Sequence, residues 1–156
     1  MTIVKMRRNL RRRNSKPAKV PTSSQFAQRE RREGVKDISV RLQNRPGTLA
    51  AAAAALHRAG LAVTGVCGFA VDGRGLRHFL VEDGEYRDIL QEAGAELVEE
   101  RDVLVVPVDP RPGWLMNFTS RLGEAGVNIK VIYMAVDNHL AVVPNDIAKA
   151  QAVLAS

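Results

Sequence analysis

The nucleophilic and imidazole side chains of this chain are few and widely spaced. Its histidines are His57, His78 and His139, and its single cysteine is Cys67. No histidine has a serine, cysteine or carboxylate at a spacing typical of a catalytic triad or a metal site. A single cysteine also excludes an intramolecular disulfide framework, which favours a reducing, cytoplasmic setting. We therefore expect no catalytic residue, metal or cofactor, and the sequence gives no reason to predict an enzyme.

A glycine turn that occurs twice carries more chemical information. Arg-Pro-Gly-Thr-Leu at 45–49 returns as Arg-Pro-Gly-Trp-Leu at 111–115, an offset of 66 residues from Gly47 to Gly113. The glycine lets a ligand approach the backbone without meeting a Cβ atom. The predicted helix behind it presents unpaired N–H groups that suit a carboxylate. The repeated turn therefore marks an internal repeat, and its backbone is suited to the approach of a ligand.

The residues around the first turn predict a strand followed by a helix. Ile38, Val40 and Leu42 alternate with polar residues, the period of a strand with one buried face. The helix after the turn ends at Gly60. Its predicted core stripe consists of residues three or four positions apart, namely Leu49, Ala52, Leu56 and Ala59.

The rest of the first copy predicts a hairpin, a second helix and a strand. The hairpin strands are expected at 61–71 and 76–81 around a turn at 72–75, the helix at 86–93, and the strand at 96–99. This order is β-α-β-β-α-β, the arrangement of a ferredoxin-like unit.

The second copy predicts the same order with shorter connections. Its first strand is expected at 103–108, running on from the preceding strand, and its hairpin at 127–136 and 140–143. Asn145 is predicted to cap a last helix that runs through Leu154. The predicted core residues of its first helix are Leu115, Phe118, Leu122 and Ala125. The last strand of the unit is missing, so we expect a sheet edge that a neighbour covers.

These elements predict an α+β fold, a ferredoxin-like βαββαβ unit repeated twice, with helices on one face of an antiparallel sheet. The predicted units span residues 36–101 and 102–156, after a basic tail at 1–35 that we expect to be disordered. Residues 1–36 contain twelve Lys and Arg and two acidic residues, Glu30 and Glu33, so their net charge is +10. The whole chain has a net charge of +6, so the remaining residues carry −4. No apolar run is long enough to span a membrane.

The charged tail leaves two interpretations open. It is either a solvated extension or an arm that binds polyanions weakly by neutralising phosphates. Phe26 is the only aromatic residue among its arginines, so stacking on bases has little support.

The chain after residue 36 resembles a tandem pair of ACT domains of the small stand-alone kind. The first unit shows Asn44-Arg45-Pro46-Gly47 and then Ala59-Gly60; the second shows 111–115 and then Gly126-Val127-Asn128-Ile129. The resemblance implies a regulatory module that binds an amino acid between paired units. It also implies a homodimer, and an output through oligomer contacts or a partner enzyme or regulator.

The resemblance further implies where the ligand lies. Family members that bind serine have one asparagine just before the turn and another at the start of the second strand of the paired unit. Asn44 holds the first position in unit one, where unit two has Pro110; Asn128 holds the second in unit two, where unit one has Ala62. This division suggests one intact site and one degenerate site. The alternative is that both asparagines are only turn and strand-start residues.

Two further side chains complete the predicted site. Trp114 either forms a wall of the ligand pocket or packs on a neighbouring strand, and Lys130 either faces a ligand carboxylate or points to solvent. The expected ligand-binding residues are Asn44, Pro46, Gly47, Thr48, Leu49, Gly113, Trp114, Asn128, Ile129 and Lys130. Tyr133 is interpreted as a core or dimer-interface ring.

Overall fold

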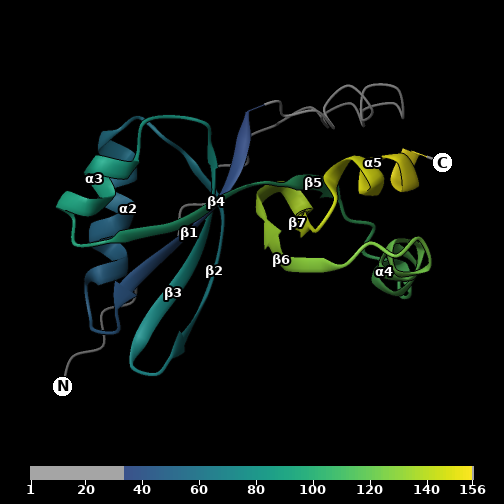
Figure 1. Ribbon diagram of the computed structural model, residues 1–156, viewed down its shortest axis with the longest axis horizontal. Helices are drawn as coiled ribbons and strands as arrows, with labels where there is room; N and C mark the ends of the chain where they lie inside the picture. The colour runs from purple at the N-terminus through teal and green to yellow at the C-terminus, as the bar shows by residue number, and fades with distance from the viewer. Residues whose placement is uncertain (1–33, 156) are drawn as a thin grey trace, which may run out of the picture.

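The computed structural model describes residues 34–155, so the predicted tail at 1–35 lies almost entirely outside the described residues. Within residues 34–155, four α-helices and seven strands follow one another in the predicted order, with one additional 3-10 turn (Figure 1). Those of the first unit are β1 (Val35–Gln43), α2 (Thr48–Arg58), β2 (Val63–Val71), β3 (Arg74–Glu82), α3 (Arg87–Glu92) and β4 (Glu96–Asp102). Those of the second are β5 (Leu104–Pro107), α4 (Trp114–Glu124), β6 (Ile129–Ala135), the 3-10 turn η1 (Val136–Asn138), β7 (His139–Pro144) and α5 (Ile147–Ala155). We call these sets unit one and unit two.

All seven strands belong to one antiparallel sheet with the order β4-β1-β3-β2-β6-β7-β5. The two units join in the middle of this order, where β2 pairs with β6 at the single residue pair Gly65 and Ala135. The helices of each unit lie on the side away from the other unit, so the strands face one another in the centre (Figure 1). The predicted fold class is confirmed.

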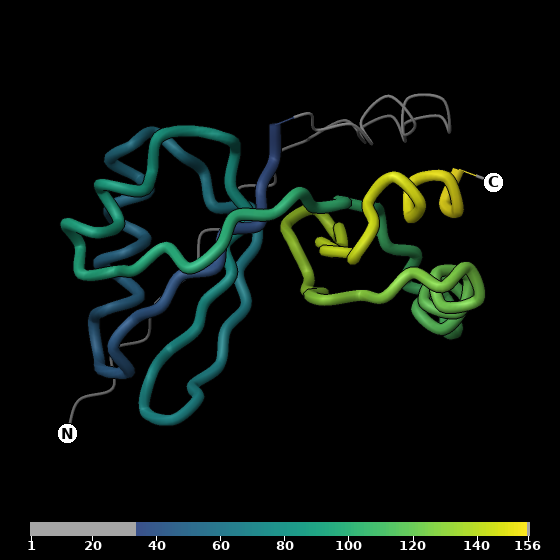
Figure 2. The backbone as a smooth tube through the Cα atoms, in the orientation of Figure 1, coloured from purple at the N-terminus to yellow at the C-terminus, as the bar shows by residue number. Residues whose placement is uncertain are grey.

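The segment that links the units crosses at one place, between Asp102 and Leu104 (Figure 2). The sequence predicts that β5 runs on from β4. The chain does continue directly from one strand into the other, but β4 and β5 lie at opposite ends of the strand order. That arrangement requires the sheet to curl, because strands that are adjacent in sequence otherwise cannot occupy both of its edges.

Each unit has its own core between its helices and its part of the sheet. In unit one, Ile38 and Val40 of β1 pack with Leu56 of α2. In unit two, Leu122 of α4 packs with Val142 of β7. A third and smaller cluster lies between the units, where its buried members are Leu80, Tyr133 and Ala141.

Two leucines that the helical spacing placed in the cores are not buried. Leu49 is 42% exposed and Leu115 is 53% exposed. Each occupies the second position of its helix, one turn before the first buried residue, Ala52 in α2 and Phe118 in α4. The middle of each predicted stripe is buried, while its first member extends past the part of the helix that packs on the sheet and its last member, Ala59 or Ala125, is a half-buried C-cap.

The cap of the last helix also differs from the prediction. Asp146, not Asn145, accepts a hydrogen bond from the N–H of Lys149 at 2.9 Å and so caps α5. Asn145 instead accepts one from the N–H of Asn128 at 2.9 Å. The two residues are adjacent and both are good caps, so position in the tertiary structure decided between them.

Among the described residues, no helix is long and apolar enough to cross a membrane.

Candidate functional site

The first glycine turn connects β1 to α2 and has the geometry that the sequence predicted. Gly47 precedes the helix with a φ of 87°, a value that favours glycine. The Thr48 hydroxyl donates to the carbonyl oxygens of Gln43 and Arg45, at 2.9 and 3.0 Å. No side chain in the described part of the chain caps the N-terminus of α2, and the same holds for α4. The first turn of the helix is therefore open to an acceptor from outside.

The second turn has the same backbone but a different side-chain arrangement. Gly113 precedes α4 with a φ of 91°. The guanidinium of Arg111 donates to Asp109, with Nε 2.8 Å and Nη2 2.5 Å from one carboxylate oxygen, and Arg111 holds the Asp109 pKa below its usual value. Unit one has Gln43 at the position of Asp109, and Arg45 makes no side-chain hydrogen bond with any described residue. Arg45 thus joins Asn44 as an available polar side chain, which the sequence analysis had not singled out.

The residues predicted from unit two lie where β6 begins. The side chain of Asn128 makes no hydrogen bond with a described residue, while its N–H and carbonyl pair with Asn145. Ile129 opens the strand opposite Pro144, and Lys130 is exposed. The strand start therefore presents an amide and an ammonium group.

Trp114 packs at the edge of the core of unit two, and its predicted role in a ligand pocket stays a prediction. Its ring stacks on Phe118 in the next turn of α4, with ring centroids 5.1 Å apart and an interplanar angle of 12°. It belongs to the partly buried residues around the core of unit two. The packing alternative thus accounts for most of this side chain, although the partner ring lies on the same helix and not on a strand.

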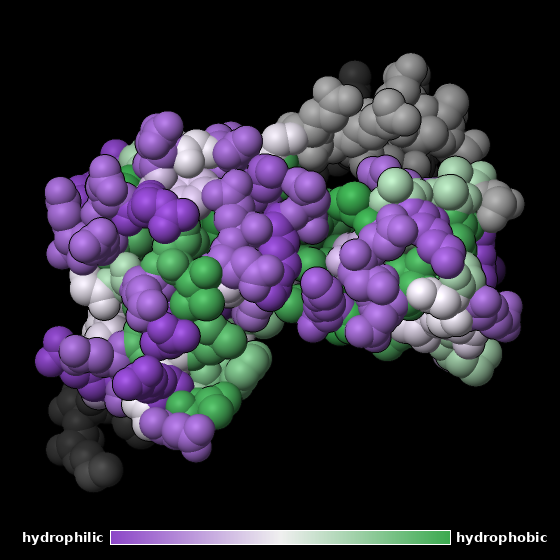
Figure 3. Space-filling model, viewed as in Figure 1, coloured by the Kyte–Doolittle hydropathy of each residue, from purple (hydrophilic) through white to green (hydrophobic). Residues whose placement is uncertain are grey.

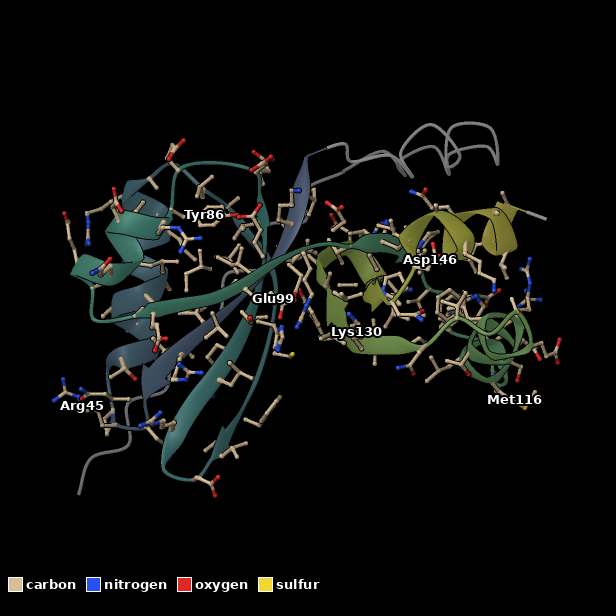
Figure 4. All side chains as sticks on the ribbon, viewed as in Figure 1. Arg45, Tyr86, Glu99, Met116, Lys130 and Asp146 are labelled. Carbon is tan, nitrogen blue, oxygen red and sulfur yellow. The ribbon has the colours of Figure 1, made fainter. Side chains whose placement is uncertain are left out.

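The two halves of the predicted site lie apart within one chain. Figure 4 shows Arg45 at the outer end of unit one and Lys130 on unit two, well separated in the same view. A site that uses both Asn44 and Asn128 therefore needs a second copy of the chain. The one-site hypothesis remains a prediction.

A shallow pocket of about 380 Å³ lies elsewhere, between α3 and the start of β4. Arg87, Gln91 and Glu96 supply its polar groups. Glu96 already pairs with Arg41 at 2.7 Å. The pocket contains no residue of either glycine turn.

A buried polar cluster joins the two units, and the sequence analysis did not find it. Asp37 of β1 is 0% exposed. One of its carboxylate oxygens accepts a hydrogen bond of 2.8 Å from the Tyr133 hydroxyl of β6, and the other lies 3.0 Å from His78 Nδ1 on β3. His139 of β7 lies outside this cluster and places its Nδ1 3.3 Å from the carbonyl oxygen of Val136.

Burial and the charge of Asp37 raise the pKa values of two neighbouring side chains. Burial, and then the carboxylate of Asp37, raise the pKa of the Tyr133 phenol far above its usual value. Burial and the negative charge of Asp37 also raise the pKa of the Cys67 thiol. Cys67 lies on β2, directly opposite His78 on β3. The phenol therefore remains a hydrogen-bond donor, and the thiol remains protonated at neutral pH.

Comparison with known proteins gives matches in structure only. No protein-family model and no curated protein matches the sequence. A structure from Bacteroides thetaiotaomicron is 22% identical over 78% of this chain and 88% of its own, with a TM-score of 0.67. The regulatory subunit of aspartate kinase from Thermus thermophilus is 20% identical over 78% and 91%, with a TM-score of 0.61. A structure of aspartokinase alpha and beta subunits is 23% identical over 78% and 90%, with a TM-score of 0.59.

These similarities concern the fold, because every identity is below 25%. The regulatory subunits of aspartate kinase are tandem ACT domains. The order of elements, the paired glycine turns and the helices on the outer face agree with this likeness. The chain therefore has the fold of a tandem pair of ACT domains.

Proposed function

We propose that this protein is a regulatory protein that binds a small-molecule amino acid at an interface between paired ACT units. Regulatory subunits among the proteins of similar fold support this role. Binding changes contacts between copies of the chain, or contacts with a partner enzyme or regulator, rather than catalysing a reaction. A coupling of about 1–3 kcal/mol between ligand and partner is typical of such proteins.

The single observation that carries the proposal is the difference between the two glycine turns. In unit one, Arg45 and Asn44 have no side-chain partner among the described residues and lie before an uncapped helix N-terminus. In unit two, Asp109 neutralises the equivalent Arg111. Both helix N-termini lack a side-chain cap among the described residues, so the difference lies in the arginine, which is available to a ligand carboxylate at the first turn and paired with Asp109 at the second. We assign the ligand carboxylate to this turn and the ligand ammonium to the amide oxygen of Asn44 or Asn128.

Open surface on β2 supports a second copy of the chain as the other wall of the site. Beyond Gly65 this strand does not pair with β6, and its sequence from 63 to 71 has no charged residue. Val66, Phe69 and Val71 are between 50% and 52% exposed, and apolar surface lies along one side of this hairpin, next to hydrophilic residues (Figure 3). A long apolar strand edge is a surface that proteins normally cover. Pairing of two copies here would bring a turn from one chain toward a strand from the other.

A thermal-shift screen of the full chain against each of the twenty amino acids tests the ligand. A ligand present at 100 times its dissociation constant stabilises the folded state by about 2.7 kcal/mol. Arg45→Ala and Asn44→Ala should abolish the shift, while the matched control Arg111→Ala should retain it. Absence of a shift with every amino acid, or equal loss in Arg111→Ala, contradicts the proposal.

Sedimentation of the parent and of Phe69→Lys tests the second copy. A dimeric parent and a monomeric variant that has lost the ligand response support an intermolecular site. Val98→Lys is the control, because Val98 is also exposed, at 42%, but lies on β4. A dimeric Phe69→Lys protein with full ligand response rules out this surface.

The charge distribution favours polyanion binding as a second candidate function. Residues 1–36 carry a net +10, and most of them lie outside the described residues. Binding of this kind falls steeply with salt, because it releases counterions. Retention of polyanion affinity after removal of residues 1–33, or at high salt, contradicts a role of the tail.

A further inference from the structure

The two units of the chain touch through a small contact. One peptide segment crosses between them at Val103, and the sheet is continuous at a single residue pair, Gly65 and Ala135. The apolar cluster between them has three buried residues. Contacts of this size between domains usually permit relative motion. The orientation of the units therefore depends strongly on any specific bond in this contact.

The hydrogen bond between Tyr133 and Asp37 is such a bond. It joins β6 of unit two to β1 of unit one, between atoms that are both withdrawn from solvent. His78, which is 4% exposed, holds the second carboxylate oxygen from β3. A buried carboxylate that loses a donor has no water to replace it, so the energy of this cluster is sensitive to small separations of the units.

Close packing around Tyr133 restricts the units to one arrangement. A Cβ atom placed at Gly65 would lie 3.1 Å from Cε2 of Tyr133, 3.2 Å from Cβ of Ala135 and 3.2 Å from Cβ of Leu80. These contacts are tighter than ordinary van der Waals contact. An alanine here would press on Tyr133, Ala135 and Leu80, so glycine favours the close approach of β2 and β6 that accompanies the bond from the phenol to Asp37.

The two strands joined by this hydrogen bond also lead to the predicted ligand-binding residues. Asp37 lies near the start of β1, whose other end leads into the turn at Asn44. Tyr133 lies on β6, four residues after Ile129 opens that strand. A displacement along either strand therefore reaches the Asp37 carboxylate through a single rigid element.

We propose that Asp37, His78 and Tyr133 form a latch between the two units, which holds them in one orientation and allows them to turn about Val103 when the Tyr133 hydroxyl leaves Asp37. The latch is a property of one chain, and it holds whether or not an amino acid binds. It provides the chain with a closed state and an open state, and anything that favours one of them shifts the distance between the units.

Distance measurements between spin labels on the two units test the latch without a ligand. Glu92 at the end of α3 and Glu124 at the end of α4 are exposed and receive the labels as cysteines in a Cys67→Ala background. The parent should give one narrow distance distribution. Tyr133→Phe should give a distribution roughly twice as wide, or a second peak. Tyr86→Phe is the matched control, since the Tyr86 hydroxyl is buried without a hydrogen-bond partner among the described residues, and it should resemble the parent.

A second variant decides the question if Tyr133→Phe does not fold, as judged by circular dichroism. Gly65→Ala retains every member of the latch but separates the strands, so it should broaden the distribution in the same way. A distribution identical to the parent in folded Tyr133→Phe, or in Gly65→Ala when the first variant is unfolded, overturns the proposal. Equal broadening in Tyr86→Phe overturns it as well, because the effect would then follow from any buried phenol.

Discussion

Arg111 donates two hydrogen bonds from its side chain to Asp109, while the equivalent Arg45 in unit one has Gln43 at the corresponding place. The bonds and the positive charge hold the pKa of Asp109 below the usual 3.8. We expect an NMR titration of the carboxyl group to show this depression in the parent and an ordinary value in Arg111→Gln. Arg45→Gln should leave the titration of Asp109 unchanged. A normal Asp109 titration in the parent would mean that Arg111 is as available as Arg45.

Tyr133→Phe should lower the free energy of unfolding by about 1–3 kcal/mol, because it leaves one oxygen of a buried carboxylate without a donor. Urea unfolding of the full chain measures the difference. The buried Tyr86 hydroxyl makes no hydrogen bond within 3.5 Å among the described residues, although the Glu100 carboxylate lies near enough to act on its pKa, so Tyr86→Phe should cost clearly less than Tyr133→Phe. Equal destabilisation in both variants would show that the loss is one of packing and not of the bond to Asp37.

Gly65→Ala should destabilise the fold by about 1–3 kcal/mol, because its Cβ atom would press on Tyr133, Ala135 and Leu80. Gly123→Ala is the matched substitution in open space within α4. It should stabilise the protein by about 0.5–1 kcal/mol through the higher helix propensity of alanine. Chemical unfolding of both variants checks the opposite signs, and a neutral Gly65→Ala would mean that β2 and β6 do not approach closely.

The two tyrosines should remain un-ionised well above their usual pKa of 10.0 in the folded protein. Burial raises both pKa values, with further contributions from the carboxylates of Glu100 at Tyr86 and Asp37 at Tyr133. Because the folded-state pKa is the higher one, this stability is fully present below pH 10 and declines as pH rises further, by about 1.4 kcal/mol per pH unit for each tyrosine. Phenolate absorbance should therefore appear together with the loss of near-ultraviolet circular dichroism. Ionisation of either tyrosine in the native state at its ordinary pKa contradicts its burial.

The repeat, the order of elements and the positions of both glycine turns could be predicted from the sequence. Local signals determine all three: period-two and period-three-to-four apolar spacing, and glycines at positions with positive φ. The same signals failed at Leu49 and Leu115, because helical spacing does not reveal where a helix extends past the sheet. They failed at Asn145 as well, since two adjacent residues can both cap a helix and only the geometry selects one.

The sequence by itself determined two ACT-like units and a difference between their turns, since Asn44 and Pro110 are visible in the printed chain. The tertiary structure decided how the units meet. Asp37 falls on the polar side of β1, and an alternating pattern reads that side as solvent-facing. It is buried because unit two covers this face and presents Tyr133 to it, from a position 96 residues away. Local periodicity contains no information about a contact at that separation, so the latch is visible only in the folded chain.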